Sequence, residues 1–127
     1  MKYRIVSAAI AIFILSGCSP VVAVVKKHEK DYQNAWCSEM NGKVEVRLDD
    51  GTRVDCLTDE YAVEVDFAKK WAESIGQSLY YADRTGRKPG VLLIVGEDDQ
   101  RFLDRLETVA AKSKIKVWIV PSSAPAE

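Results

Sequence analysis

The chain is 127 residues long and carries 18 lysine and arginine residues against 19 aspartate and glutamate residues, a net charge of −1 at pH 7. A chain of this length holds one domain with a modest core. The slightly acidic balance excludes a generally basic surface for nucleic acid, so any such binding would need a local patch.

The first residues have the composition of a targeting segment. Lys2 and Arg4 form a positive start, and the apolar stretch from Ile5 to Leu15 is too short to span a bilayer as a helix. It leads into Leu15-Ser16-Gly17-Cys18, which resembles the lipobox of bacterial lipoprotein signal peptides. The resemblance implies cleavage before Cys18 and acylation of that cysteine.

The lipobox implies a protein of the bacterial cell envelope. We expect a signal peptide over 1–17 and a lipidated tether over 18–26, which anchors the chain to the membrane without crossing it and leaves it facing the periplasm. Ser19 after the cysteine favours the outer membrane, as in enterobacteria. Two alternatives stay open: an ordinary signal peptide with a chance cysteine, and an uncleaved anchor. Loss of 1–17 would leave 16 basic and 19 acidic residues, a net charge of −3.

Two further cysteines, Cys37 and Cys56, follow in the domain. Their separation excludes the C-x-x-C spacing of zinc and redox sites. An exported, oxidising location favours a disulfide between them, and the alternative is a pair of buried thiols.

The first predicted elements are a helix and three strands. A helix is expected over 27–40, because its aromatic residues fall on one face, and Asn41-Gly42 ends it. Residues 43–57 alternate between apolar and charged side chains around a tight turn at Asp50-Gly51, which predicts a hairpin. Residues 61–67 predict a third strand.

A second helix is predicted over 67–83. Its expected apolar stripe consists of Ala68, Trp71, Ala72, Ile75 and Leu79. Gly76 weakens this helix by roughly 1 kcal/mol relative to alanine, so we expect it to permit a close helix contact.

The last predicted elements are a loop, a buried strand, a helix and a final strand. Residues 84–90 form a basic loop, and the continuous apolar run over 91–95 is typical of a strand buried on both faces. A helix begins after Asp98 or Asp99, a strand covers 115–120, and 121–127 is a small-residue tail that we expect to be disordered. The order α-β-β-β-α-β-α-β predicts an α/β domain over 27–120, with a small mixed sheet flanked by helices.

Three carboxylates fall on one side of two neighbouring predicted strands. Glu64 and Asp66 alternate with apolar residues along the third strand, and Asp55 lies in the strand before it. Grouped carboxylates repel one another unless something neutralises them, and a hard divalent cation with oxygen ligands does so. The alternative is an ordinary solvated strand face.

Further residues give this patch a family resemblance. Glu39, Asp55 in "RVDC", Glu64 and Asp66 in "VEVDF", and Gln77 with Tyr81 in "GQSLYY" look like the ordered motifs of the PD-(D/E)XK nuclease superfamily. The Q-x-x-x-Y pair is most similar to its branch of recombination-associated nucleases and Holliday-junction resolvase relatives. The resemblance covers about residues 30–95 and implies a restriction-endonuclease-like αβββαβ core, followed here by a helix and a strand.

The resemblance also implies roles for these residues. Asp55 and Glu64 would hold one or two Mg²⁺ or Mn²⁺ ions, and Glu39 would complete the acidic shell. Gln77 and Tyr81 would orient the site or contact a phosphodiester. The metal would lower the pKa of a bound water and stabilise the charge that develops on the phosphate oxygens. The reaction that the resemblance implies is hydrolysis of a DNA strand.

One position departs from the family pattern. The superfamily places lysine two residues after the glutamate, and here that residue is Asp66. Some restriction enzymes of the superfamily carry an acidic residue there, and Lys69 or Lys70 could supply the missing ammonium group. Two functions are therefore open. The first is a membrane-tethered, metal-dependent nuclease that acts on DNA, and the second is a catalytically degenerate lipoprotein that keeps the fold as a binding or structural module.

Overall fold

The computed structural model describes residues 25–123. The predicted signal peptide, Cys18, most of the tether and the end of the predicted tail lie outside the described residues, so their predictions stay untested. Within the described range, no helix combines the length and apolar character needed to cross a membrane.

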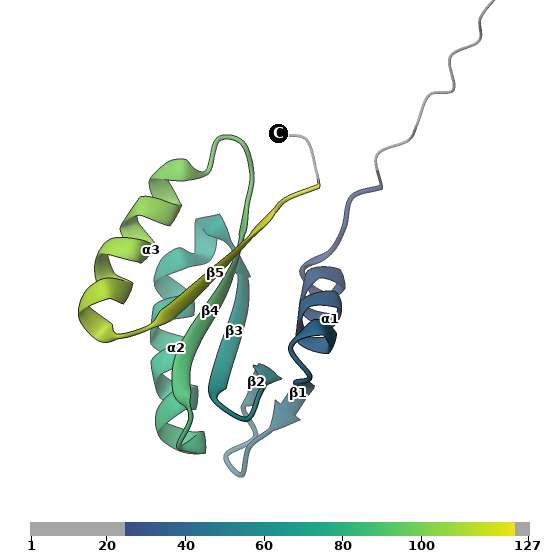
Figure 1. Cartoon of the computed structure of the whole chain (residues 1–127), viewed down its shortest axis with the longest axis vertical. Helices are drawn as coiled ribbons and strands as arrows, with labels where there is room; N and C mark the ends of the chain where they lie inside the picture. Colours follow the sequence, from purple (N-terminus) through teal and green to yellow (C-terminus); the bar gives the residue numbers. More distant parts are fainter. Residues whose placement is uncertain (1–24, 124–127) are drawn as a thin grey trace, which may run out of the picture.

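Residues 25–123 form a five-stranded sheet with helices on both faces (Figure 1). Its elements are α1 (Glu29–Glu39), β1 (Lys43–Arg47), β2 (Arg53–Leu57), β3 (Tyr61–Phe67), a 3₁₀ turn (Ala68–Lys70), α2 (Trp71–Thr85), β4 (Lys88–Val95), α3 (Gln100–Ser113) and β5 (Lys116–Pro121). The strands lie in chain order; β1, β2 and β3 are antiparallel, while β3, β4 and β5 are parallel. The mixed α/β architecture is as predicted.

The strand β4 forms the centre of the core. Val91, Leu92, Leu93 and Ile94 are all fully buried. Val91 and Leu93 pack under α2 and α3, whereas Leu92 and Ile94 pack with the residues under α1. The continuous apolar run therefore predicted correctly a strand covered on both faces.

The predicted basic loop over 84–90 is wrong at both ends and correct only at residues 86–87. The backbone N–H of Lys88 donates to the carbonyl of Glu60, and Lys88 aligns with Tyr61, so β4 begins three residues before the apolar run. α2 continues to Thr85 and ends at Gly86, whose φ of 68° is the left-handed conformation that glycine adopts easily. Only Gly86 and Arg87 connect α2 to β4.

The buried face of α2 also differs from the predicted stripe. Ala72 and Leu79 are exposed, and the sheet is covered instead by a face that includes Ser74 and Ser78, both fully buried. Each serine hydroxyl donates to a carbonyl three residues earlier in the helix, at 2.8 and 2.9 Å. Burial of these small polar residues is tolerated because their hydrogen bonds are satisfied locally, which the apolar pattern does not reveal.

The helix α1 is fixed to the sheet by a disulfide between Cys37 and Cys56, whose Cα atoms lie 5.7 Å apart. Asn41, two residues after the end of α1, has a φ of 53°, and the N–H of Gly42 donates to the carbonyl of Cys37 at 2.9 Å. A Cβ atom on Gly42 would lie 2.6 Å from the Sγ of Cys56 and 2.7 Å from that of Cys37. Glycine is therefore required here by the two sulfur atoms.

Replacing Gly42 with alanine is expected to lower the free energy of unfolding by about 1–3 kcal/mol, because the added methyl group overpacks the disulfide. Chemical denaturation of the oxidised protein measures this change. Gly76→Ala is the matched control. A Cβ at Gly76 meets nothing within 4 Å, so the predicted close helix contact is wrong and alanine should stabilise α2 by about 0.5–1 kcal/mol. Equal effects of the two substitutions would contradict this account.

Candidate functional site

A cleft of about 770 Å³ lies where the β1–β2 hairpin separates from β3, beside the first turn of α1. Its acidic residues are Glu29, Glu45, Asp55 and Glu64, and its basic residues include Lys26, Lys27, Lys30, Arg53 and Lys70. The cleft therefore combines buried carboxyl groups with a rim of cations.

The cleft opens because β2 leaves β3 at Asp55. The two strands pair only at Cys56 with Val63 and Leu57 with Ala62. At the next position the Oδ2 of Asp55 accepts the backbone N–H of Val65 at 2.8 Å. A side chain thus takes the hydrogen bond that a continuing strand would have made, and the space beyond it is left open.

Asp55 and Glu64 line this opening, and Asp66 lies near them behind it. Glu64 and Asp66, both on β3, are only 6% and 4% exposed, and Asp55 is half-buried. The carboxyls of Asp55 and Glu64 lie close enough for each to shift the pKa of the other. Among the described residues, the Oε2 of Glu64 is the buried side-chain oxygen without a hydrogen-bond partner. Such an atom is costly to bury, so the site is incomplete without a ligand or a proton.

Burial is the main cause of perturbed acidity at this site. It raises the pKa of Glu64 well above its ordinary value, and the negative charges of Asp55, Asp66 and Glu29 raise it further. Burial likewise raises the pKa of Asp55, and it raises the pKa of Asp66 to about 7. Glu64 therefore holds its proton near neutral pH, and Asp66 holds one for part of the time, unless a cation compensates them.

One lysine lies beside the carboxyls. The Nζ of Lys70, at the end of the 3₁₀ turn, is 3.7 Å from the Oδ1 of Asp66. Its charge lowers the pKa of Asp66 against the effect of burial. Lys69 is exposed and does not line the cleft, so of the two lysines considered from the sequence, Lys70 is the one at the site.

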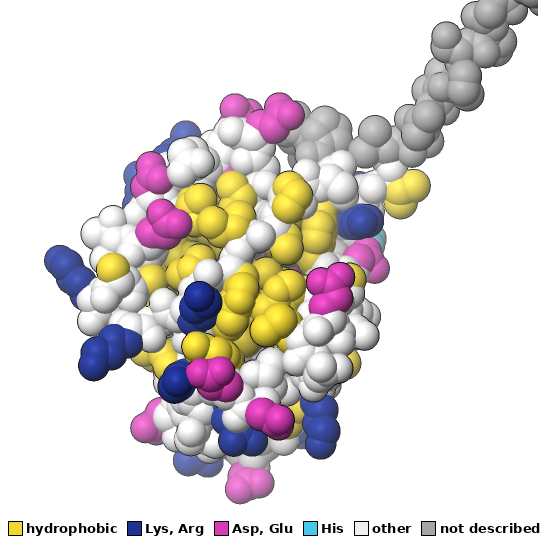
Figure 2. Space-filling model, viewed as in Figure 1, with side chains coloured by type: hydrophobic (Ala, Val, Ile, Leu, Met, Phe, Trp, Pro, Cys, Tyr) yellow, Lys and Arg dark blue, Asp and Glu magenta, His cyan; other side chains and the backbone are white. Residues whose placement is uncertain are grey.

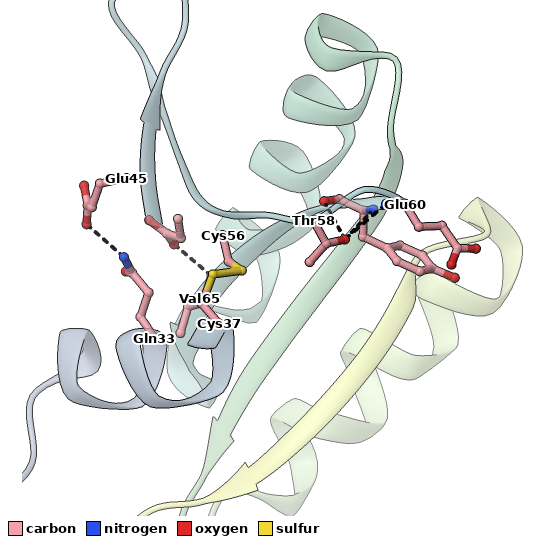
Figure 3. Close-up of a disulfide and its surroundings, with 9 residues drawn as sticks. Gln33, Cys37, Glu45, Cys56, Thr58, Glu60 and Val65 are labelled. Carbon is pink, nitrogen blue, oxygen red and sulfur yellow. Dashed lines mark hydrogen bonds between the residues drawn. A yellow bond between two sulfur atoms is a disulfide. The ribbon is translucent and has the colours of Figure 1, made fainter. Parts of the chain in front are cut away.

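The side of the cleft formed by α1 and β1 is held by Gln33 and Glu45. The Nε2 of Gln33 donates to the Oε1 of Glu45 at 3.0 Å, and Figure 3 shows the two side chains facing each other beside the Cys37–Cys56 disulfide. The Oε2 of Glu45 pairs with Arg53 at 3.1 Å. Glu45 also has a φ of 54° inside a strand, a strained conformation for a residue other than glycine and one that clusters at functional sites.

Tyr81 is the member of the predicted Q-x-x-x-Y pair that reaches the cleft. It is 8% exposed and packs against Val54 and Ala62. It lines the cleft together with Asp55 and Glu64, and its pKa is raised by burial and then by the charge of Glu64. Gln77 is exposed and is not among the lining residues.

Glu39 does not join the acidic group. It is exposed at the last position of α1, whereas the cleft is lined by the first turns of that helix. Sequence reasoning missed Glu29 and Gln33, which lie four residues apart and hence on one helix face. The four-residue spacing of these two polar residues, in a helix that directly precedes the acidic strands, is the signal that could have identified them.

Two carboxylates are available to a metal ion. Within residues 25–123 no group of three or more histidine, cysteine, aspartate and glutamate residues is arranged to hold one. Asp55 and Glu64 nonetheless supply two adjacent carboxyl groups, and Mg²⁺ is commonly bound by one or two carboxylates with water completing its shell. The partnerless oxygen of Glu64 fits a ligand of this kind.

Comparison with known proteins gives one informative similarity. No protein-family model and no solved structure matches the chain. The chain is 30% identical over 97 residues to a protein of Acanthamoeba polyphaga mimivirus that is named as KilA-N domain-containing. The match covers 73% of this chain and 37% of the viral protein, so the chain spans just over a third of that relative. The PD-(D/E)XK resemblance therefore stays a prediction.

The stability of the metal-free protein is expected to fall as the pH rises from about 5 to about 8. The folded state holds protons on Glu64 and Asp66 that the unfolded chain, with ordinary carboxyl pKa values of about 4, has released. Glu64→Gln should flatten this dependence and raise the free energy of unfolding at pH 8 by about 1.4 kcal/mol or more, the equivalent of one pKa unit.

Urea denaturation with a chelator at several pH values measures this dependence. Glu39→Gln, the same substitution at an exposed carboxylate, is the control and should leave the profile unchanged. A wild-type stability that rises over this range would contradict the uncompensated burial of the carboxyl groups.

Proposed function

We propose that the chain binds nucleic acid at this cleft and hydrolyses a phosphodiester bond with Mg²⁺ or Mn²⁺ held by Asp55 and Glu64. The observation that carries the proposal is the pair formed by half-buried Asp55 and buried Glu64, with one oxygen of Glu64 left without a hydrogen-bond partner in a cleft that several lysines also line. Such a pair attracts a divalent cation, and the rim attracts phosphate. The similarity to a KilA-N domain-containing protein is in keeping with a nucleic-acid-related role.

The proposed roles of the residues around the cleft follow from their charges. Asp55 and Glu64 would hold the metal, which would supply Lewis-acid stabilisation of charge developing on the phosphate oxygens. Lys70 lies beside Asp66 and would place a positive charge near the same oxygens. In this arrangement Asp66, which stands where the superfamily has lysine, positions a lysine supplied by the following turn.

The cationic rim would bind the flanking phosphates. Lys26, Lys27 and Lys30 come from the start of α1 and the residues before it, and Arg53 comes from β2. These cations would bind phosphates despite the acidic net charge of the chain, with Arg53 also paired with Glu45.

We also propose that the domain works outside the cytoplasm on a lipid anchor at Cys18. The lipobox-like segment supports this location, and so does the Cys37–Cys56 disulfide, since such bonds persist mainly in oxidising compartments. Radiolabelled palmitate incorporation, abolished by Cys18→Ser, tests the anchor independently of any activity.

The purified protein is expected to cleave linear, single-stranded or branched DNA when Mg²⁺ or Mn²⁺ is present. Asp55→Asn and Glu64→Gln should abolish cleavage, because each removes a metal ligand. Lys70→Met should slow it by about 10²–10³-fold, the usual effect of removing one group that stabilises the transition state. Gel-based cleavage kinetics measure these effects.

Lys69→Met is the matched control for Lys70→Met and should retain activity, since Lys69 is exposed and outside the cleft. Cleavage that survives Asp55→Asn would contradict the proposed metal site. A protein that binds DNA and Mn²⁺ in calorimetry without cleaving any substrate would favour the catalytically degenerate binding module.

A further inference from the structure

The two edges of the sheet are protected very differently. Edge strands expose unpaired backbone groups, and natural proteins shield them with charges, distortions or short length because they readily pair with another chain. The edge strand β1 has five residues, three of them charged, and Glu45 in its centre has a φ of 54°. This edge therefore carries the usual protection against strand pairing.

The opposite edge, β5, has none of these features in its centre. Lys116 and Pro121 bound a run of four apolar residues, and no residue within the strand has a positive φ. β5 pairs with β4 along its whole length and has no partner strand on its outer side within the described part of the chain. Ile119, in the middle of this edge, is 49% exposed.

An aromatic patch adjoins the same edge. Trp118 of β5 is half-buried, with ring centroids 5.0 Å from Trp36 of α1 and 5.1 Å from Tyr61 of β3. Gly90 leaves room for its ring, since a Cβ there would lie 2.7 Å from it. Figure 2 shows hydrophobic side chains gathered over β5 and on the face between it and α1. α1 thus covers only part of this face.

We propose that β5 pairs antiparallel with β5 of a second copy of this chain, which joins two sheets into one. Pairing about a two-fold axis at Trp118 sets the two tryptophans opposite each other. It also sets Lys116 opposite Val120 and Val117 opposite Ile119, so no like charges face each other across the strands. The β5 strands of two copies can therefore pair without a clash of charge, as a two-fold interface between identical surfaces requires.

The apolar centre of β5 favours a second copy over a nucleic acid strand. Two lysines lie over aromatic rings of the patch: Lys88 over Tyr61, with its ammonium group paired with Glu60 at 2.8 Å, and Lys116 over Trp118. A polyanion is bound mainly through many positive charges, whereas the four apolar residues between Lys116 and Pro121 suit pairing with another apolar strand. The candidate cleft lies at β2 and β3, away from this edge, so dimerisation leaves both clefts accessible and does not rest on the proposed function.

Sedimentation velocity of the full-length chain in a mild detergent is expected to give a concentration-dependent dimer. Ile119→Lys places a lysine at the edge, as natural edge strands do to prevent pairing with another chain. It should raise the dissociation constant of the dimer about tenfold or more. Val44→Lys is the matched control, because Val44 is 43% exposed on the other edge strand and the variant keeps the same N-terminal segment. It should dimerise like the wild type.

Amide hydrogen exchange supplies a second measurement. Outward-facing amides of β5 should exchange more slowly as the wild-type concentration rises, and this protection should be absent in Ile119→Lys. Three results would overturn the proposal: a monomer at every concentration, a dimer equally sensitive to Val44→Lys, and β5 amides protected only on addition of a single-stranded oligonucleotide.

Discussion

The hydrogen bond from the backbone N–H of Val65 to the side chain of Asp55 marks the point at which β2 separates from β3 and the cleft begins. Up to that point β2 and β3 form an ordinary antiparallel ladder, and beyond it the hairpin separates from the rest of the sheet. A side chain can satisfy one amide but cannot continue a strand. The separation opens a cleft that Glu64 of β3 lines, and the first turns of α1 line the same cleft.

The resulting site is electrostatically unfavourable on its own. Buried carboxyls cost free energy when ionised, and Asp66 has Lys70 as a neighbouring cation while one oxygen of Glu64 has no partner. The disulfide holds this arrangement in place, because Cys56 directly follows Asp55 and Cys37 lies one turn after Gln33. Stability is therefore lower than the packing alone would allow, as is common where a fold carries a binding site.

Local patterns predicted most of the elements and part of the site. Alternation placed β3 at residues 61–67, and the apolar run of β4 predicted its burial on both faces. The start of β4 at Lys88 was missed because it depends on pairing with β3 and not on hydrophobicity. The polar buried face of α2 was missed because serine hydroxyls can be satisfied within a helix. Gln77 was chosen by its spacing from Tyr81, but it lies on the solvent side of α2, because the buried face of this helix includes Ser74 and Ser78.

The sequence by itself determined the α/β class, the run of strands and helices, and the presence of Asp55, Glu64 and Asp66 on adjacent strands, because these follow from periodicities of two and 3.6 residues. Only the tertiary structure decided which other groups meet them. It brought Glu29, Gln33 and Lys70 to the cleft and left Glu39 and Lys69 in solvent. Such contacts depend on how far β2 diverges from β3 and on where α1 is fixed, and neither is encoded in local spacing.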